Sequence, residues 1–297
     1  MKIKWFLIIG LIVGMFFLTV PTGFCDDQGS MAQQAQFVEP VGDNGSINWS
    51  TGVIEAVGIG APPKKYFGLP QARPLALRAA KVDAYRNLLE VVKGVQVTAT
   101  TMVANFAVES DIIRTRVEGM VRGAQIVKKE YLSDGTVEVT MRMSMSGGLV
   151  QIMLPRVMEI EQAGRPVAPT PPGYAPAAPA APAGPVYTGL VIDARGISAR
   201  PAMSPKVVDE DGREVYGSMQ VDREFAVQQG MSGYARDLTA AQSNPRVTNN
   251  PITIKGLSTK SPGQANIVIS NADAQMIRAA AENLAFLKKC RVMIVLD

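Results

Sequence analysis

A segment rich in proline and alanine, residues 164–186, divides this chain of 297 residues into two parts. Proline fixes φ and lacks a backbone N–H, so the segment favours an extended polyproline II spacer over a helix or a sheet. We therefore predict two small domains, residues 47–163 and 187–297, which the semi-rigid spacer holds apart. The expected fold class is α+β, each domain being a mainly antiparallel sheet packed with one or two helices.

The first 25 residues have the three parts of an export signal. Lys2 and Lys4 precede an apolar run over residues 5–20, and the small residues Gly23 and Cys25 stand just before a polar stretch. This order is typical of a secretion signal. We predict that residues 1–25 form a signal peptide and that the protein is exported to the periplasm or to the periplasmic face of the outer membrane.

Processing of this signal has three alternatives at Cys25. Cleavage after Cys25 releases the protein, lipid attachment uses Cys25 itself, and an uncleaved segment is a marginally long anchor. Phe24 disfavours lipid attachment, because a lipoprotein signal has a small residue at that position. Membrane contact is therefore expected only if Cys25 is lipidated or the signal stays uncleaved. Residues 26–46, which follow, are polar and aperiodic, which predicts a flexible leader.

Charge and cysteine content narrow the classes of partner. The chain has a net charge of +4, and removal of Lys2 and Lys4 with the signal leaves +2. A nucleic-acid partner is not expected, since it requires lysine and arginine clustered on one face. The two cysteines are Cys25 and Cys290, so a processed chain with one thiol has no internal disulfide.

In the first domain, hydrophobic residues recur every three or four positions over residues 73–92, which predicts a helix that ends at Gly94. Other elements follow from local pattern and composition. They are a strand over residues 47–59, a strand over residues 95–108 with a helix over residues 102–107 as its alternative, and a short helix over residues 111–121.

A hairpin over residues 124–145 has the clearest local signature, because Asp134 and Gly135 form a turn between two strand-like runs. In its second strand, side chains alternate strictly between apolar and polar. Val137, Val139, Met141, Met143 and Met145 share one face, which favours packing on helices. A metal-binding methionine surface is the alternative, but a period of two already explains the pattern.

The second domain shows strands, one further Asp-Gly hairpin and a helix near its end. The predicted strands cover residues 187–194 with continuation through 202, 206–209, 213–216, 252–254, 266–269 and 291–296. Residues 222–229 form a short helix, and residues 232–250 are loop-rich. Ser270 caps a helix with Asp273 as its partner, and the apolar face of that helix carries Ile277, Ala280, Ala281, Leu284 and Leu287.

Residues for catalysis are scarce. The chain lacks histidine, which excludes serine-histidine and cysteine-histidine nucleophilic sites and the usual zinc centres. Gly58-Ile59-Gly60 lacks the third glycine of a dinucleotide motif, and residues 209–212 lack the spread of ligands in a calcium loop. Cys290 is interpreted as a small buried residue rather than a reactive thiol. We expect no catalytic residue, no cofactor and no metal.

The segment 78–95, together with Gly58-Ile59-Gly60 and the hairpin over residues 123–145, resembles the small outer-membrane lipoprotein family that includes the flagellar basal-disc protein FlgP. It is also similar to the N-terminal domain of the flagellar assembly protein FlgT. The resemblance covers residues 49–160. It implies a non-enzymatic envelope protein that assembles with itself or with flagellar proteins.

The sequence therefore favours a non-enzymatic cell-envelope assembly protein, a structural component near the flagellar basal body. A peptidoglycan- or polysaccharide-binding module is the alternative, and its candidate stacking residues are Trp49, Tyr66, Tyr187 and Tyr216. A hydrolase that uses paired carboxylates is a third class, but spacing along the chain does not identify such a pair.

Overall fold

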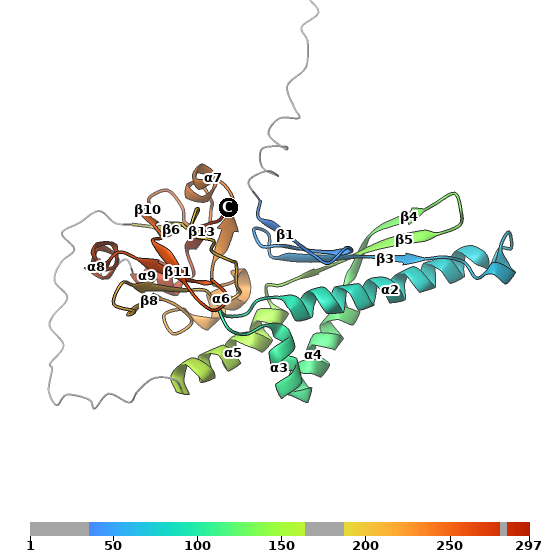
Figure 1. Ribbon diagram of the computed structural model, residues 1–297, viewed down its shortest axis with the longest axis horizontal. Coiled ribbons are helices and arrows are strands. Elements are labelled where there is room, and N and C mark those ends of the chain that lie inside the picture. The colour runs from blue at the N-terminus through green and yellow to red at the C-terminus, as the bar shows by residue number, and fades with distance from the viewer. Residues whose placement is uncertain (1–35, 164–186, 280–283) are drawn as a thin grey trace, which may run out of the picture.

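The computed structural model describes residues 36–163, 187–279 and 284–297. The predicted signal with Cys25 and the predicted proline-alanine spacer lie outside the described residues, as do Ala280 and Ala281. Figure 1 shows the first domain as an elongated unit and the second as a rounder unit at one of its ends. None of the helices within the described ranges combines the length and the apolar character needed to cross a membrane.

The first domain is built on a five-stranded antiparallel sheet in the order β1-β2-β3-β5-β4. Its strands are β1 (Val38–Val41), β2 (Gly45–Asn48), β3 (Val53–Gly60), β4 (Gln125–Tyr131) and β5 (Val137–Ser144). The long helix α2 (Ala72–Gly94) covers one face of this sheet (Figure 1). The antiparallel sheet with helices that we predicted for this domain is confirmed.

The prediction of a flexible leader up to residue 46 is wrong at its end, because β1 and the start of β2 lie there. Val38 pairs with Asn48 and Val41 with Gly45, so β1 adds an edge strand to the sheet. Such a short strand with Pro40 inside it has no clear hydrophobic period, and an edge strand tolerates proline. Its pairing partner, rather than its own sequence, makes it a strand.

Helix α2 packs on the sheet through small residues. Ala76, Ala80 and Ala84 are fully buried on its inner face, one turn apart, and Leu88 continues the row. They face β3 at Gly58 and Gly60, where an added Cβ would lie 2.0 Å from the backbone nitrogen of Ala84 and 2.3 Å from the carbonyl oxygen of Ala76, respectively. The Gly58-Ile59-Gly60 motif thus allows close contact between helix and strand.

The predicted strand over residues 95–108 is wrong, and the helical alternative for its second half is confirmed. Gln96 and Met102 form a single bridge around a threonine-rich turn, after which helix α3 (Val103–Glu109) begins. The Asn105 side chain accepts the Met102 N–H at 2.7 Å and fixes the helix start. Local capping therefore prevails over the β propensity of valine and threonine.

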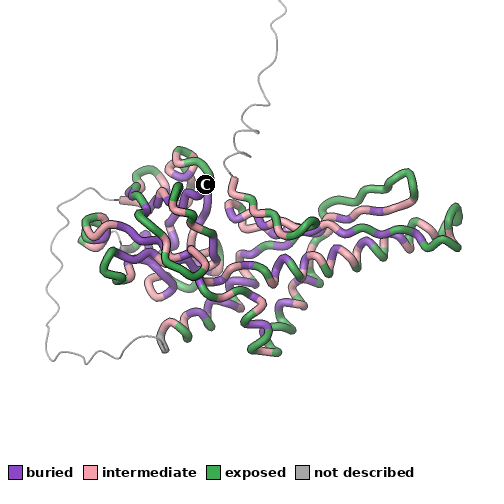
Figure 2. Tube along the Cα trace, in the orientation of Figure 1, coloured by how far each residue is buried: buried purple, intermediate pink, exposed green. Residues whose placement is uncertain are grey.

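Three further predictions in the first domain are confirmed. Helix α4 (Asp111–Arg122) begins after Ser110, and β4 and β5 form the predicted hairpin. The methionine face of β5 is buried, as Figure 2 shows along the strand. Helix α5 (Gly148–Ala163) then runs toward the second domain.

The second domain has two four-stranded sheets, and the prediction of a mainly antiparallel arrangement is wrong. One sheet, in the order β10-β6-β13-β9, is wholly parallel, and the other, in the order β11-β12-β7-β8, is mixed. The strands of the parallel sheet are β6 (Gly189–Asp193), β9 (Gly233–Ala235), β10 (Pro251–Lys255) and β13 (Val292–Val295). The mixed sheet contains β7 (Lys206–Asp209), β8 (Glu214–Tyr216), β11 (Ser258–Lys260) and β12 (Asn266–Ile269).

Parallel pairing requires crossover connections, here made by long loops and short helices. The helices are α6 (Arg223–Gln229), α7 (Leu238–Gln242), α8 (Asn271–Ala279) and α9 (Leu284–Lys288). The predicted helix over residues 222–229 and the last strand are confirmed, and β13 is buried between β6 and β9. The predicted loop over residues 232–250 is wrong, since it includes β9 and α7.

Two local predictions in the second domain are confirmed in atomic detail. The Ser270 hydroxyl accepts the Asp273 N–H at 3.0 Å and donates to the Asp273 carboxylate at 2.7 Å, so Ser270 caps α8. β7 and β8 form the Asp-Gly hairpin, in which Gly212 has φ of 82°. The predicted extension of the first strand through residue 202 is wrong, because β6 ends at Asp193.

Candidate functional site at the domain junction

The two domains are in direct contact, which corrects the prediction that they are held apart. Backbone hydrogen bonds cross the junction, from the Met203 N–H to the Gln96 carbonyl at 2.9 Å and from the Ser204 N–H to the Val97 carbonyl at 2.8 Å. Ala99, Ala202 and Ala265 pack together beside them. A spacer defines how far two domains are able to separate, but the contacts between their surfaces decide whether they do.

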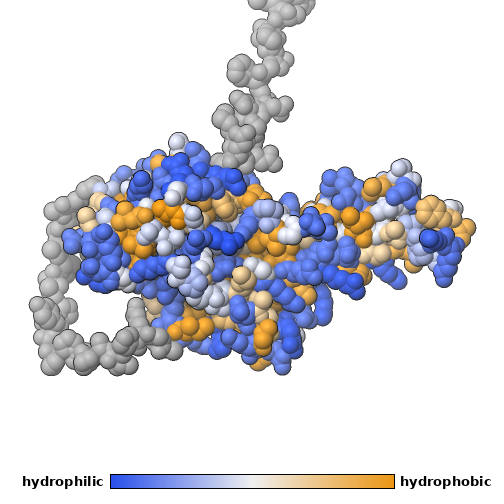
Figure 3. Space-filling model, in the orientation of Figure 1, coloured by the Kyte–Doolittle hydropathy of each residue, from blue (hydrophilic) through white to orange (hydrophobic). Residues whose placement is uncertain are grey.

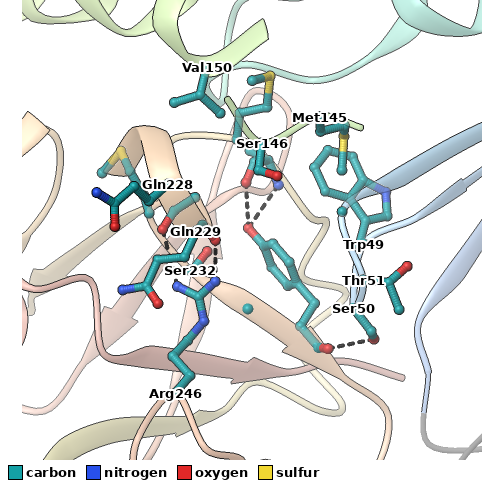
Figure 4. Close-up of a pocket in the computed structure, with 17 residues that line it drawn as sticks. Trp49, Ser50, Thr51, Met145, Ser146, Val150, Gln228, Gln229, Ser232 and Arg246 are labelled. Carbon is teal, nitrogen blue, oxygen red and sulfur yellow. Dashed lines mark hydrogen bonds between the residues drawn. The ribbon is translucent and has the colours of Figure 1, made fainter. Parts of the chain in front are cut away.

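Trp49 and Tyr234 form the centre of this junction. Trp49 lies in the turn between β2 and β3, and Tyr234 lies on β9. Their rings are 5.7 Å apart at 74°, an edge-to-face arrangement, and both side chains are buried. The Ser50 hydroxyl next to Trp49 donates to the Tyr234 carbonyl at 2.6 Å (Figure 4).

The Tyr234 hydroxyl is fully hydrogen-bonded inside the junction. It donates to the Ala202 carbonyl at 2.7 Å and accepts the Ala202 N–H at 2.9 Å. Burial raises the pKa of Tyr234 to about 12, so the hydroxyl stays neutral at physiological pH. Tyr234 therefore fixes the 202 loop, which itself carries the backbone hydrogen bonds to the first domain.

Polar contacts surround the apolar centre. Lys206 forms an ion pair with Glu161 of α5 at 3.0 Å, and the Ser218 hydroxyl donates to the same carboxylate. At β1 and just before it, Arg200 lies 3.3 Å from Glu39, and the Arg236 guanidinium lies 5.3 Å from the centre of the Phe37 ring. Each exposed ion pair among these contributes little to stability, but together the contacts favour one orientation of the two domains.

A cavity of about 290 Å³ opens at this junction. The β2–β3 turn forms one wall, with Trp49 and Ser50, and the segment from Gln228 to Tyr234 forms another (Figure 4). Met145 and Val150 of the first domain add apolar surface, and Arg246 of the second domain adds a cation.

Arg246 is committed to backbone carbonyl groups. Its guanidinium donates to the carbonyl oxygens of Gly230 at 3.1 Å, Cys290 at 2.9 Å and Gln229. Burial lowers its pKa, and within the described part of the chain no carboxylate forms an ion pair with it. Gln229 ends α6, and Cys290 lies in the turn between α9 and β13, so Arg246 ties the end of α6 to the segment that leads into β13.

Side chains that form hydrogen bonds line much of the cavity. Its polar groups are the hydroxyls, amides and guanidinium of Ser50, Thr51, Ser146, Gln228, Gln229, Ser232, Tyr234 and Arg246. These side chains donate and accept hydrogen bonds, but none is a carboxylate, an imidazole or a thiol that transfers protons near neutral pH. Among the described residues, no group of three His, Cys, Asp or Glu side chains is placed to hold a metal ion.

The candidate stacking residues are not brought together. Trp49 and Tyr216 are buried, with 4% and 0% of their surfaces exposed, so their assignment as sugar-stacking residues is wrong. Tyr66 is half-buried far out on the first domain with Lys65 over its ring, and Tyr187 is half-buried just before β6. Aromatic residues that are sparse along a chain are used in its core as readily as on its surface.

Two other motifs have structural roles. Asp209 in the second hairpin is fully buried and accepts hydrogen bonds from Arg213 and Arg278, both at 2.9 Å, which leaves it unsuited to calcium. Cys290 is buried, and burial raises the pKa of its thiol to about 11. The interpretation of Cys290 as a small buried residue is confirmed.

A family model of known proteins matches the second domain. The family model described as the second domain of Treponema pallidum Tp0624 matches residues 189–297. This range begins at the first residue of β6 and includes both sheets of the second domain. The first domain lies outside the match. A comparison with curated proteins found no match.

Proposed function

We propose that this protein is a non-enzymatic assembly component of the cell envelope. The observation that carries the proposal is that the two domains dock into one body while none of the helices within the described ranges covers one face of the first-domain sheet. Helix α2 covers the other face, as Figure 1 shows. Two docked domains of this kind offer surfaces to partner proteins and keep those surfaces in a fixed relative orientation.

The uncovered face is lined by outward-pointing residues of β3 and β5. It combines charged, polar and apolar side chains, which are Glu55, Val57, Ile59, Glu138, Thr140 and Arg142. Ile59 is 51% exposed, and Arg142 forms an ion pair with Glu55 at 2.5 Å. Such a mixed surface is typical of protein interfaces that form after folding. The sheet edge at β4 has a register shift after Ile126, which opposes simple strand addition.

The expected place of assembly is the flagellar basal body, on the periplasmic side. Support comes from the export signal in residues 1–25 and from the resemblance of residues 49–160 to flagellar envelope proteins. Clean deletion of the gene, followed by swimming assays and electron cryotomography of the motors, tests this placement. Lost motility with missing basal density supports it, and normal motility with intact motors contradicts it.

Assembly through the uncovered face has a separate test. A photo-crosslinking residue at Ile59 should capture a partner or a second copy in living cells. The matched control is the same residue at Val82, which is 47% exposed on α2. Equal capture at both positions, or none at Ile59, would contradict assembly through this face.

The alternative is a peptidoglycan- or polysaccharide-binding module. It has less support, because the burial of Trp49 and Tyr216 leaves Tyr66 and Tyr187 as accessible aromatic candidates. Co-sedimentation with insoluble peptidoglycan distinguishes the two functions. Retention that depends on Tyr66 or Tyr187 would favour the polysaccharide function.

A further inference from the structure

The far end of the first domain is a narrow tip formed by two loops. Residues 61–73, which include the short helix η1 (Lys64–Tyr66), lie beside the turn of the β4–β5 hairpin (Figure 1). Pro62, Phe67 and Leu69 from the first loop share one shallow hollow with Ser133 and Asp134 from the second. This tip projects away from the second domain, so the domain junction does not cover it.

Apolar side chains at this tip are exposed. Phe67 is 63% exposed and Leu69 is 50% exposed, and Tyr131 and Leu132 of the neighbouring hairpin are 53% and 47% exposed. Figure 3 shows orange and tan surface at this end of the molecule. Several large apolar groups on adjacent loops indicate a contact surface rather than isolated surface residues.

The charged residues of the tip are mainly cations. The first loop carries Lys64 and Lys65, and Arg73 follows in the first turn of α2; residues 61–73 have no acidic residue, while Asp134 is the acidic residue of the hairpin turn. Lys65 lies 4.8 Å from the centre of the Tyr66 ring, and Arg73 lies 5.8 Å from that of Tyr131. The cations therefore lie directly beside the aromatic and apolar groups.

We propose that this tip docks on an anionic lipid surface. Apolar groups that enter the boundary between headgroups and acyl chains, with cations at the phosphate level, form a favourable contact with such a surface. A narrow, projecting tip reaches a flat bilayer without obstruction from the rest of the molecule. Contact between the tips of two copies is opposed, because each carries a net positive charge.

A second pair of exposed apolar residues lacks the neighbouring cations of the tip. Val108 and Ile112, at the α3–α4 corner, are 84% and 66% exposed, but Glu109 and Asp111 lie between them along the chain. Acidic side chains are repelled by anionic headgroups. Asp111 forms an ion pair with Arg114 at 2.5 Å, and Glu109 lies 3.9 Å from Arg156, so the corner has no unpaired cluster of cations beside its apolar pair. It therefore supplies a control with at least as much apolar exposure and without the cationic character of the tip.

Vesicle flotation with residues 26–297 tests the proposal, because this chain lacks the apolar run of the signal. Vesicles of phosphatidylglycerol and phosphatidylethanolamine should bind the protein, and vesicles of phosphatidylcholine should bind it much more weakly. The double variant Phe67→Ser, Leu69→Ser should lower the partition coefficient about tenfold or more. The double variant Val108→Ser, Ile112→Ser should leave it unchanged.

Charge is tested by Lys64→Gln with Lys65→Gln, which should weaken binding about twenty-fivefold, since each cation near an anionic surface contributes about fivefold. Lys288→Gln with Lys289→Gln removes the same charge from an exposed pair in the second domain and should have little effect. A Phe67→Trp variant should shift its emission to the blue on binding, because Trp49 is already buried.

Three results would overturn the proposal. These are no binding to either vesicle, equal loss in the tip variants and their controls, or concentration-dependent self-association that the tip variants abolish without any effect on vesicles. The proposal does not depend on the assembly function. Its failure would leave crosslinking through Ile59 unaffected, and a failure of that crosslinking would leave vesicle binding intact.

Discussion

Gly58 of β3 lies against the backbone of Ala84 in α2, so closely that a Cβ on Gly58 would be 2.0 Å from the Ala84 nitrogen. This distance is far inside van der Waals contact. The atoms are backbone, which cannot move aside as the end of a side chain does. Helix and sheet therefore have to separate along the whole alanine row if Gly58 is replaced.

We predict that Gly58→Ala destabilises the first domain by about 3 kcal/mol or more, at or above the upper end for overpacked cores. Urea unfolding followed by Trp49 fluorescence measures the change. Gly119→Ala is the control, because Gly119 is in α4 with open space around its Cα and should gain about 0.5–1 kcal/mol. Equal stabilities for the two variants would contradict the close packing.

A feature of this structure can be predicted from the sequence when the residues that determine it lie close together along the chain. The helix α2, the two Asp-Gly hairpins and the Ser270 cap are set by residues within a few positions of each other, and all were predicted. The parallel sheet was missed, because the pairing of β6 with β10 and β13 joins residues about 60 and 100 positions apart. The hydrophobic pattern of a strand does not specify which other strand pairs with it.

The candidate site was also missed for this reason. Trp49 is a candidate stacking residue in the sequence because its side chain is aromatic, but its contact partner Tyr234 is 185 residues away in a different domain. The predicted strand over residues 95–108 is instead a turn and a helix, and the carbonyls of Gln96 and Val97 receive N–H groups from Met203 and Ser204. These contacts depend on how two folded surfaces fit, which local patterns do not reveal.

Domain docking should depend on Gly263, where a Cβ would lie 1.8 Å from the carbonyl oxygen of Ala99 in the first domain. We predict that Gly263→Ala opens the junction. Trp49 is the one tryptophan after residue 25, so its emission reports the opening as a shift to the red. Small-angle X-ray scattering should show a larger radius of gyration for the same variant.

Gly196→Ala is the control for Gly263→Ala. Gly263 and Gly196 have φ of 77° and 78°, so alanine carries the same backbone cost of about 1 kcal/mol at both positions. Gly196 has no atom close to the added Cβ. Matching red shifts in the two variants would mean that backbone strain, and not contact between the domains, causes the effect.

Acid should destabilise the second domain through Asp209. Burial opposes its ionisation, but the Arg213 N–H and the guanidinium groups of Arg278 and Arg213 outweigh burial and lower its pKa to about 2. The unfolded pKa is about 3.9, so the unfolded state binds the proton first as pH falls. The contribution of Asp209 to stability is therefore full above about pH 4 and is lost as the pH falls toward 2.

Asp209→Asn should reduce stability near neutral pH and flatten its dependence between about pH 4 and pH 2. Urea unfolding followed by circular dichroism at several pH values measures both effects. Asp211→Asn is the control, because Asp211 is 56% exposed and pairs with the same Arg213. An unchanged acid profile in Asp209→Asn would show that other carboxylates determine the acid sensitivity.

Cys290 should resist thiol reagents in the folded protein. It occupies the second position after α9 with φ of 55°, and its side chain is fully buried. Burial raises the pKa of its thiol to about 11, so the thiolate that attacks a disulfide reagent is scarce at pH 8.

A chain of residues 26–297 should therefore release little chromophore from Ellman's reagent at pH 8 when folded and one equivalent in urea. Ser133→Cys, in the exposed hairpin turn, should add one fast equivalent in the folded state and confirm that the reagent is active. Fast reaction of Cys290 in the folded wild-type chain would mean that the end of α9 opens readily. The Arg246 hydrogen bond to the Cys290 carbonyl would then fail to hold the start of β13 in place.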